Sequence, residues 1–509
     1  MKKIFGRVIV VVPAIAVQVA WYILLFGILN RILNQHLADI INVIFTILAV
    51  VFVLYLITKR DESSYKILWV IVIVAMPILG ALLYLFLGDK STGKELKGKL
   101  EKSKESLQIN ELKGNKNCIE DIRKENLRIG QTLSHLSDST GFPLYNNSTA
   151  KYYSFGEEMF KDMLVDLKTA EEFIYIEYFI IQSGKFWDSI TDILEEKAAA
   201  GVDVRVMYDD LGSIATYSPK DIKALLNKGI RCIAFNPFFF IKTQLNNRDH
   251  RKMMIIDNKI AYSGGVNLAD EYINETHPFG RWKDIGFRIT GDAVNSYTYM
   301  FAEFWNAFAI TKIEPERVKF SVSDSETENG YILPYYDSPV RDEHTSNILF
   351  AEMLSMATDY VWFYTPYLML GDALFDAFIR AAERGVDVRI ITPGIPDKKI
   401  VYALTRSYYK DLLEAGVKIY EYTPGFVHAK AFIADDIVCG IGTVNLDYRS
   451  LFLHFECNSV FYNADIIKEL KADFLETQDE CHERTLAEEK TGILHRLINS
   501  VLRVAAPLL

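Results

Sequence analysis

Three long apolar stretches open the chain. Residues 8–29 contain Gln18 as their one strongly polar side chain, and residues 40–58 and 67–88 carry no charge. A helix needs roughly 20 apolar residues to span the hydrocarbon core of a bilayer. We therefore expect residues 1–89 to form a membrane anchor with two to three transmembrane helices. The alternative for the first stretch is a cleaved signal peptide, but its apolar run is longer than such peptides usually have.

The charges around these stretches leave their orientation open. With the N-terminus inside, six Lys and Arg side chains flank the stretches on the inner side and seven on the outer side, whereas a clear excess would mark the cytoplasmic side. Residues 90–140 are rich in Lys, Glu and Ser, which predicts a basic juxtamembrane linker able to rest on anionic headgroups. Residues 486–509 predict a C-terminal amphipathic helix, lying either at the membrane interface or docked on the protein.

Strand-like and helical patterns alternate from about residue 141, and the same order occurs twice. Each copy has an apolar strand pattern, a helical pattern, a glycine and a second strand pattern. The copies occupy Phe173–Ile181, Trp187–Ala200 and Val202–Tyr208, and then Asp359–Tyr367, 372–384 and Val386–Thr392. Alternating strands and helices indicate α/β units. We predict two α/β halves, 141–330 and 331–485, related by a pseudo-twofold axis and preceded by the transmembrane helices.

Composition narrows the possible partners. The net charge is −10, and it divides into +7 for residues 1–104 and −17 for the remaining 405 residues. Binding to nucleic-acid phosphates relies on positive charge, so we do not expect nucleic acid as a partner. The five cysteines lie far apart without a CxxC spacing. This spacing excludes a thiolate zinc site and a dense disulfide framework.

One polar motif is repeated, once in each predicted half. It consists of a His, a Lys two positions later, an Asp after four more residues, and an Asn seventeen positions after the His. The two sets are His250, Lys252, Asp257 and Asn267, and His428, Lys430, Asp435 and Asn445. Residues two apart on a strand project to the same face, so we expect each His and Lys to point into one site. A single His-x-Lys would more often be structural, but two copies with identical spacing indicate a functional site.

These residue types fit chemistry on a phosphate diester. Two Lys and two Asn can bind the phosphate oxygens, and two His can divide the roles of nucleophile and general acid. We expect neither a metal nor another cofactor, because the lysines supply the positive charge that a metal otherwise brings.

Carboxylates near the motifs have different expected roles. Asp257 and Asp435 lie five residues past the lysines, on the opposite strand face, and we expect them to be structural. Asp284 and Glu456 precede predicted strands and are candidates for orienting the histidines, as in a catalytic triad. The alternative for both is a surface carboxylate at a strand start. Glu177, on an apolar strand, would face the site or form a buried salt bridge.

The chain resembles the phospholipase D superfamily, whose signature is a repeated H-x-K-x4-D followed by G-G/S/T-x-N. The resemblance covers roughly residues 140–485. Within the superfamily it is most similar to the bacterial cardiolipin synthases, which also share the anchored N-terminus with Leu68-Trp69 and Pro77-Ile-Leu-Gly80, the extension Asn445-Leu-Asp-Tyr-Arg449-Ser450 and the apolar end Ala506-Pro-Leu-Leu.

The resemblance implies a phosphatidyltransferase in the cell membrane that acts on phosphatidylglycerol among anionic lipids. One phosphatidylglycerol would lose glycerol to form a phosphatidyl-histidine, and a second would accept the phosphatidyl group to give cardiolipin. It further implies two membrane spans, a cytoplasmic catalytic part, His250 as nucleophile and His428 as acid. Alternatives are hydrolysis by a phospholipase D, transfer to serine, a lipid-binding scaffold and, least favoured, a nuclease. The sequence does not indicate the oligomeric state.

Overall fold

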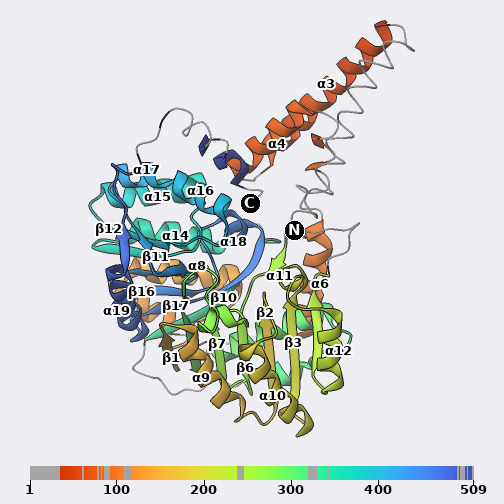
Figure 1. The fold of residues 1–509 in the computed structure, drawn as a ribbon, viewed down its shortest axis with the longest axis vertical. Helices are drawn as coiled ribbons and strands as arrows, with labels where there is room; N and C mark the ends of the chain where they lie inside the picture. The colour runs from red at the N-terminus through yellow and green to blue at the C-terminus, as the bar shows by residue number, and fades with distance from the viewer. Residues whose placement is uncertain are drawn as a thin grey trace. The chain divides into compact units, whose positions relative to one another are not determined.

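The computed structural model describes residues 35–59, 62–76, 80–81, 83–84, 92–107, 112, 114, 117–237, 246–318, 330–341, 343–489, 492, 499–500 and 502–506. The chain forms two compact units. One consists of Met1–Ser91 with Ser500–Leu508, and the other of Thr92–Asn499 with Leu509. Figure 1 shows the helices and strands of both units.

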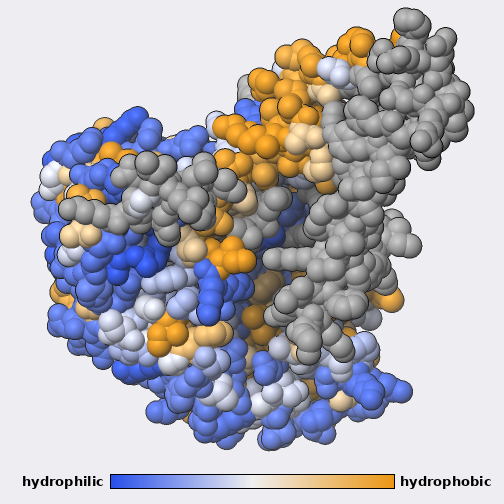
Figure 2. All heavy atoms as spheres, turned by 45° about the horizontal axis from the view of Figure 1, so that its top comes forward, coloured by the Kyte–Doolittle hydropathy of each residue, from blue (hydrophilic) through white to orange (hydrophobic). Residues whose placement is uncertain are grey.

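The smaller unit contains the helices α3 (Gln35–Thr58) and α4 (Ser63–Ala75). Many of their large apolar side chains are exposed, and Figure 2 shows apolar side chains gathered over these helices; examples are Ile44, Ile47, Val51, Leu54, Ile67 and Val74. Within the described ranges, no helix combines the length and apolarity that crossing a bilayer requires. The expected span at 8–29 lies outside the described residues, as do most of the predicted span beyond residue 76 and half of the predicted C-terminal helix 486–509.

Three helices lie in the region where we expected a linker. They are α6 (Thr92–Leu107), α7 (Cys118–Glu125) and α8 (Leu127–Thr140). Within the larger unit, α6 packs on the helix Val294–Phe308: the Ser103 hydroxyl donates to the Glu303 carbonyl at 2.6 Å, and the Lys104 ammonium lies 3.7 Å from the Glu303 carboxylate. Helix α8 ends at Gly141, which adopts a left-handed conformation typical of a helix C-terminus.

A seven-stranded sheet forms the first half, in the order β1-β9-β7-β6-β2-β3-β4. Strands β2, β3 and β4 are parallel, and the others pair antiparallel. The strands are β1 (Ser148–Tyr153), β2 (Phe173–Tyr178), β3 (Asp203–Asp209), β4 (Arg231–Phe235), β6 (Met253–Ile256), β7 (Ile260–Gly264) and β9 (Gly286–Gly291). The helices are α9 (Gly156–Leu167), α10 (Lys185–Ala199), α11 (Asp210–Ser213), α12 (Pro219–Asn227) and α13 (Val294–Phe308).

The second half repeats this arrangement, in the order β10-β17-β16-β15-β11-β12-β13-β18. Its strands are β10 (Tyr331–Asp337), β11 (Tyr360–Tyr364), β12 (Asp387–Pro393), β13 (Lys418–Tyr422), β15 (Ala431–Ala434), β16 (Val438–Gly442), β17 (His454–Tyr462) and β18 (Cys481–Glu483). Its helices are α14 (Thr345–Met356), α15 (Asp372–Glu383), α16 (Lys399–Ser407), α17 (Tyr409–Glu414), α18 (Tyr448–Phe452) and α19 (Ile466–Asp479). Apart from β18, each strand has a counterpart in the first sheet, so the two α/β halves expected from the sequence are confirmed.

The core continues from one half into the other. Every residue of β2 and β11 is buried, as expected for parallel strands covered on both faces. Helix α13 is buried over nearly its whole length and contacts both β2 and β10. Its Tyr297 hydroxyl lies 2.9 Å from the Ser459 hydroxyl of β17. The two halves therefore share one continuous interior.

Two short parallel strand pairs join the halves. Strand β5 (Arg248–Asp249) of the first half pairs with the start of β17, and β14 (Gly425–Val427) of the second half pairs with β8 (Arg281–Lys283). Strands β5 and β14 each end directly before a motif histidine. The His-x-Lys segments thus lie in the connections that follow these strands, and the expectation that they lie on a strand is wrong.

Candidate active site

Backbone pairing across the halves fixes the position of each histidine. The amide of His250 donates to the Phe455 carbonyl at 2.9 Å, and the amide of His428 donates to the Lys283 carbonyl at 2.7 Å. Phe455 and Lys283 directly precede the two candidate orienting carboxylates. Each histidine is therefore held against the carboxylate of the opposite half.

The side chains repeat this crossing. Nδ1 of His250 lies 2.9 Å from both oxygens of Glu456, and Nδ1 of His428 lies 2.6 Å from Oδ2 of Asp284. An ionised carboxylate accepts a hydrogen bond, so beside the ionised form of Asp284 or Glu456 Nδ1 carries the ring proton and Nε2 keeps its lone pair. This tautomer leaves Nε2 free to attack phosphorus or to exchange a proton.

The two carboxylates are held differently. The Thr443 hydroxyl donates to Oε2 of Glu456 at 2.5 Å, and the Ile285 amide donates to Oδ1 of Asp284 at 2.9 Å. Burial raises the pKa of Glu456 to about 8, against the opposing effect of Lys252. Burial acts in the same direction on Asp284, but His428 and Lys430 outweigh it, and the pKa of Asp284 lies below its usual range. The Asp284 pair therefore has the stronger anionic character.

Both motif lysines are buried beside the histidines. The ammonium of Lys252 donates to the His250 carbonyl at 2.7 Å, and that of Lys430 donates to the His428 carbonyl. Burial lowers their pKa values to about 8 and about 7, respectively, although Glu456 and Asp284 oppose the shift. An anionic phosphate would relieve this burial cost by restoring a counter-charge.

The histidines are neutral at physiological pH. Burial and then Lys430 lower the pKa of His428 to about 4, although Asp284 opposes the shift. The pKa of His250 is also well below its ordinary value, because of burial and the charges of Lys252 and Lys430. Neutral rings can act as nucleophile and base, and a bound anion would favour protonation of the ring that acts as acid.

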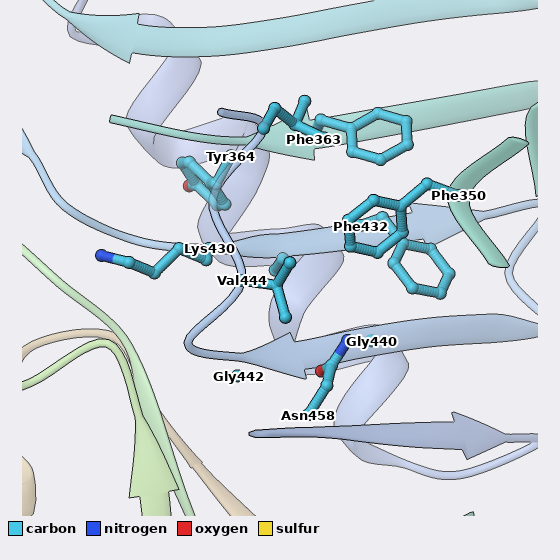
Figure 3. Close-up of a pocket in the computed structure, with 11 residues that line it drawn as sticks. Phe350, Phe363, Tyr364, Lys430, Phe432, Gly440, Gly442, Val444 and Asn458 are labelled. Atoms are coloured by element: carbon cyan, nitrogen blue, oxygen red, sulfur yellow. The ribbon is translucent and has the colours of Figure 1, made fainter. Parts of the chain in front are cut away.

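A small hollow, with room for about one water molecule, lies in the second half beside Lys430. Aromatic side chains form much of its lining, among them Phe350, Phe363 and Phe432. Figure 3 shows the Lys430 ammonium pointing away from these rings. The side chain thus leaves the apolar interior and reaches the His428 carbonyl.

The two motif asparagines are buried and tie the motif loops to neighbouring residues. Oδ1 of Asn267 accepts from the Ile180 amide at 3.1 Å, and its Nδ2 donates to the Tyr272 hydroxyl at 2.8 Å. Nδ2 of Asn445 donates to Asp447 at 3.0 Å. An amide nitrogen carries two hydrogens, so these bonds leave each asparagine one further donor for a phosphate.

Asp257 and Asp435 bind the backbone at the starts of β2 and β11. The Asp257 carboxylate accepts backbone N–H bonds from residues 171–173 at 2.7–2.8 Å, and the Asp435 carboxylate accepts the equivalent bonds from residues 358–360 at 2.8–2.9 Å. Both residues have left-handed backbone conformations, with φ of 51°. The structure does not place either carboxylate against a motif histidine.

Two features of the site lack a clear signal in the sequence. Aromatic rings surround the histidines: Phe179 lies 4.8 Å from His250, and Tyr272, Trp282 and Phe426 lie 5.3, 5.6 and 6.0 Å from His428, centre to centre. In addition, the buried Arg251 forms ion pairs with Glu177 and Asp249. Glu177 thus forms a buried salt bridge.

Within the described part of the chain, no cluster of His, Cys, Asp and Glu side chains has an arrangement that would hold a metal ion.

Comparison with known proteins agrees with this geometry. Residues 163–295 and 350–477 match the family described as cardiolipin synthase, PLD-like domain, and residues 44–88 match that described as phospholipase D-nuclease N-terminal. A phosphatidylserine synthase structure from Haemophilus influenzae Rd KW20 aligns with 75% of this chain and 100% of its own, with a TM-score of 0.59 and 13% identity. At this identity, the likeness is one of fold.

Two relatives align over nearly their whole length. An uncharacterised protein of Streptococcus mutans is 42% identical over 90% of this chain and 99% of its own. A cardiolipin synthase of Alkalihalophilus pseudofirmus is 32% identical over 96% of this chain and 98% of its own. The chain belongs to the cardiolipin synthase family, whose members carry phospholipase D-like domains.

Proposed function

We propose that this protein is a membrane-bound phosphatidyltransferase that makes cardiolipin from two molecules of phosphatidylglycerol and releases glycerol. The observation that carries the proposal is the pair of crossed His–carboxylate contacts, each beside a buried lysine. The cardiolipin synthase of Alkalihalophilus pseudofirmus, which aligns over nearly its whole length, supports cardiolipin as the product.

The chemistry is two displacements at phosphorus. In the first, Nε2 of one histidine forms a bond to phosphorus, the bond from phosphorus to glycerol oxygen breaks, and the other histidine gives that oxygen a proton. In the second, a headgroup hydroxyl of another phosphatidylglycerol attacks phosphorus, its proton returns to the second histidine, and the N–P bond breaks. Lys252 and Lys430, with the spare amide donors of Asn267 and Asn445, bind the phosphate oxygens throughout.

We assign His250 as the nucleophile and His428 as the acid and base. The charge of Asp284 supports this division, because an anionic partner stabilises an imidazolium, the form that an acid must adopt. Glu456, with its raised pKa, gives His250 less of this support. A nucleophile needs the neutral ring, so weaker support for the charged form suits His250.

Exposed apolar side chains support membrane association. Those on α3 and α4 are the side chains that a lipid environment would cover, and we propose that residues 1–89 cross the membrane two or three times. We propose the cytoplasmic side for the catalytic part. Protease added outside intact spheroplasts should then leave residues 140–509 intact, and digestion of that region would reverse the assignment.

Product analysis tests the function. Membranes containing the protein, incubated with phosphatidylglycerol labelled in its acyl chains, should form labelled cardiolipin and release glycerol. The double variant His250→Ala/His428→Ala serves as the blank. Phosphatidate as the sole product would indicate hydrolysis, phosphatidylserine formed with added serine would indicate a different acceptor, and no turnover would favour a lipid-binding scaffold.

A further inference from the structure

The proposed reaction places the headgroup beside His428. Displacement at phosphorus proceeds with the attacking and leaving groups roughly in line. With His250 as nucleophile, glycerol leaves on the opposite side, where His428 protonates it. The hydroxyl of the second lipid enters at the same place. Residues around His428 are therefore the ones that contact the headgroup.

Three aromatic rings lie around His428. The rings of Tyr272, Trp282 and Phe426 lie against the imidazole, and the Tyr272 hydroxyl accepts a hydrogen bond from Asn267. These rings exclude water but offer few acceptors for hydroxyl groups. A glycerol headgroup carries hydroxyl donors, so its recognition requires a further polar group nearby.

The loop that follows β12 supplies such a group. The amide of Ile395 donates to the Gly425 carbonyl at 3.1 Å, which fixes the loop against β14, the strand that leads into His428. Two residues later, Oδ2 of Asp397 accepts from the Tyr367 hydroxyl at 2.7 Å. The Tyr367 ring lies 6.4 Å from Phe426. The carboxylate is thus joined to the aromatic rings around His428.

Asp397 keeps capacity to bind a ligand. Its side chain is 17% exposed, and Lys398 lies 3.6 Å from Oδ2. Among the described residues, the contacts of this carboxylate all involve Oδ2, and Oδ1 has no hydrogen-bond donor. A carboxylate oxygen accepts hydrogen bonds from hydroxyls more strongly than a neutral acceptor does.

Among its described residues, the first half has no counterpart to this arrangement. The bridge between Leu368 and Leu446 corresponds to that between Ile181 and Leu268, which places Ile180 at the position of Tyr367. Isoleucine cannot hold a carboxylate by a hydroxyl group. The polar pair therefore belongs to the His428 side of the site, where the headgroup lies.

Resting on the proposed function, we propose that Asp397, held by Tyr367, accepts hydrogen bonds from the hydroxyls of the glycerol headgroup and so favours a glycerol-bearing acceptor over water. Asp397 then determines how the phosphatidyl-enzyme divides between transfer and hydrolysis. Hydrogen bonds to charged groups of this kind correspond to about a 10- to 100-fold preference.

The ratio of cardiolipin to phosphatidate, formed from labelled phosphatidylglycerol in one incubation, tests the proposal. Because both products come from the same folded molecules, partial misfolding does not alter the ratio. We expect Asp397→Ala to lower the ratio of cardiolipin to phosphatidate about 10- to 100-fold and Tyr367→Phe to lower it less. Asp397→Glu should give a ratio between those of the wild type and Asp397→Ala. Asp376→Asn, which changes an exposed carboxylate on α15, is the matched control.

An unchanged ratio in Asp397→Ala would overturn the proposal, as would an equal fall in the Asp376→Asn control. A wild-type protein that forms no cardiolipin would instead refute the proposed function. The two failures are therefore distinguishable in one experiment.

Discussion

Replacing Gly265 by alanine should disable the second catalytic pair without touching a catalytic residue. A Cβ at this position would lie 2.0 Å from Oδ1 of Asp284, whereas such contacts essentially never fall below 3.0 Å. The carboxylate must therefore move by about 1 Å or more. Because it bonds Nδ1 of His428 at 2.6 Å, this movement breaks the contact that orients the imidazole.

The expected loss is large. A misplacement of about 1 Å at a reacting group costs about 10²-fold in rate, and loss of an orienting carboxylate about 10⁴-fold. We expect Gly265→Ala to reduce cardiolipin formation by about 10²- to 10⁴-fold. The equivalent position, Thr443, already carries a Cβ. Thr443→Ala removes a hydroxyl that bonds one orienting carboxylate, that of Glu456, and whose other bonds are to the backbone of Cys457. The rate of cardiolipin formation should fall about tenfold or less in the Thr443→Ala control, which is the usual effect of losing one hydrogen bond.

The wild type, Gly265→Ala and Thr443→Ala are compared by their initial rates with labelled phosphatidylglycerol, measured on purified protein in lipid. Thermal unfolding of each variant shows whether the fold is retained. If folded Gly265→Ala stays within tenfold of the wild type, the carboxylate of Asp284 is not needed to orient His428. If Thr443→Ala falls equally far, the steric argument fails.

Three further results are expected. Activity should persist in excess chelator, since Lys252 and Lys430 supply the positive charge; complete loss with rescue by one divalent ion would contradict this. A phosphatidyl ester of p-nitrophenol needs little protonation of its leaving group, so it should label His250 covalently in His428→Ala protein, whereas label on His428 in His250→Ala protein would exchange the roles. Replacing Asp435 by asparagine should lower the free energy of unfolding by about 1–3 kcal/mol, because an amide has one acceptor oxygen for three backbone donors; an unchanged denaturation midpoint would argue against a structural role.

Local sequence patterns determined the two α/β halves. Continuous apolar runs predicted β2 and β11, and the spacing of apolar residues predicted α10 and α15, all close to their observed bounds. Such patterns are sufficient because burial of a strand or helix face depends on residues only a few positions apart. The repeated spacing also identified the motif residues, since a duplicated unit carries its polar groups at the same places.

Only the tertiary structure decided which groups meet. His250 and Glu456 are 206 residues apart, and Asp284 and His428 are 144 apart; the sequence indicated these carboxylates as partners for the histidines but not the crossed pairing. That pairing follows from the short parallel strands β5 with β17 and β14 with β8, which exist because the two halves pack face to face. Pairing within each half decides the rest: β7 with β9 brings Gly265 against Asp284, and the loop that carries Asp397 lies against β14, the strand before His428. Periodicity carries no information about such contacts, because it describes which face of an element is buried and not what lies against it.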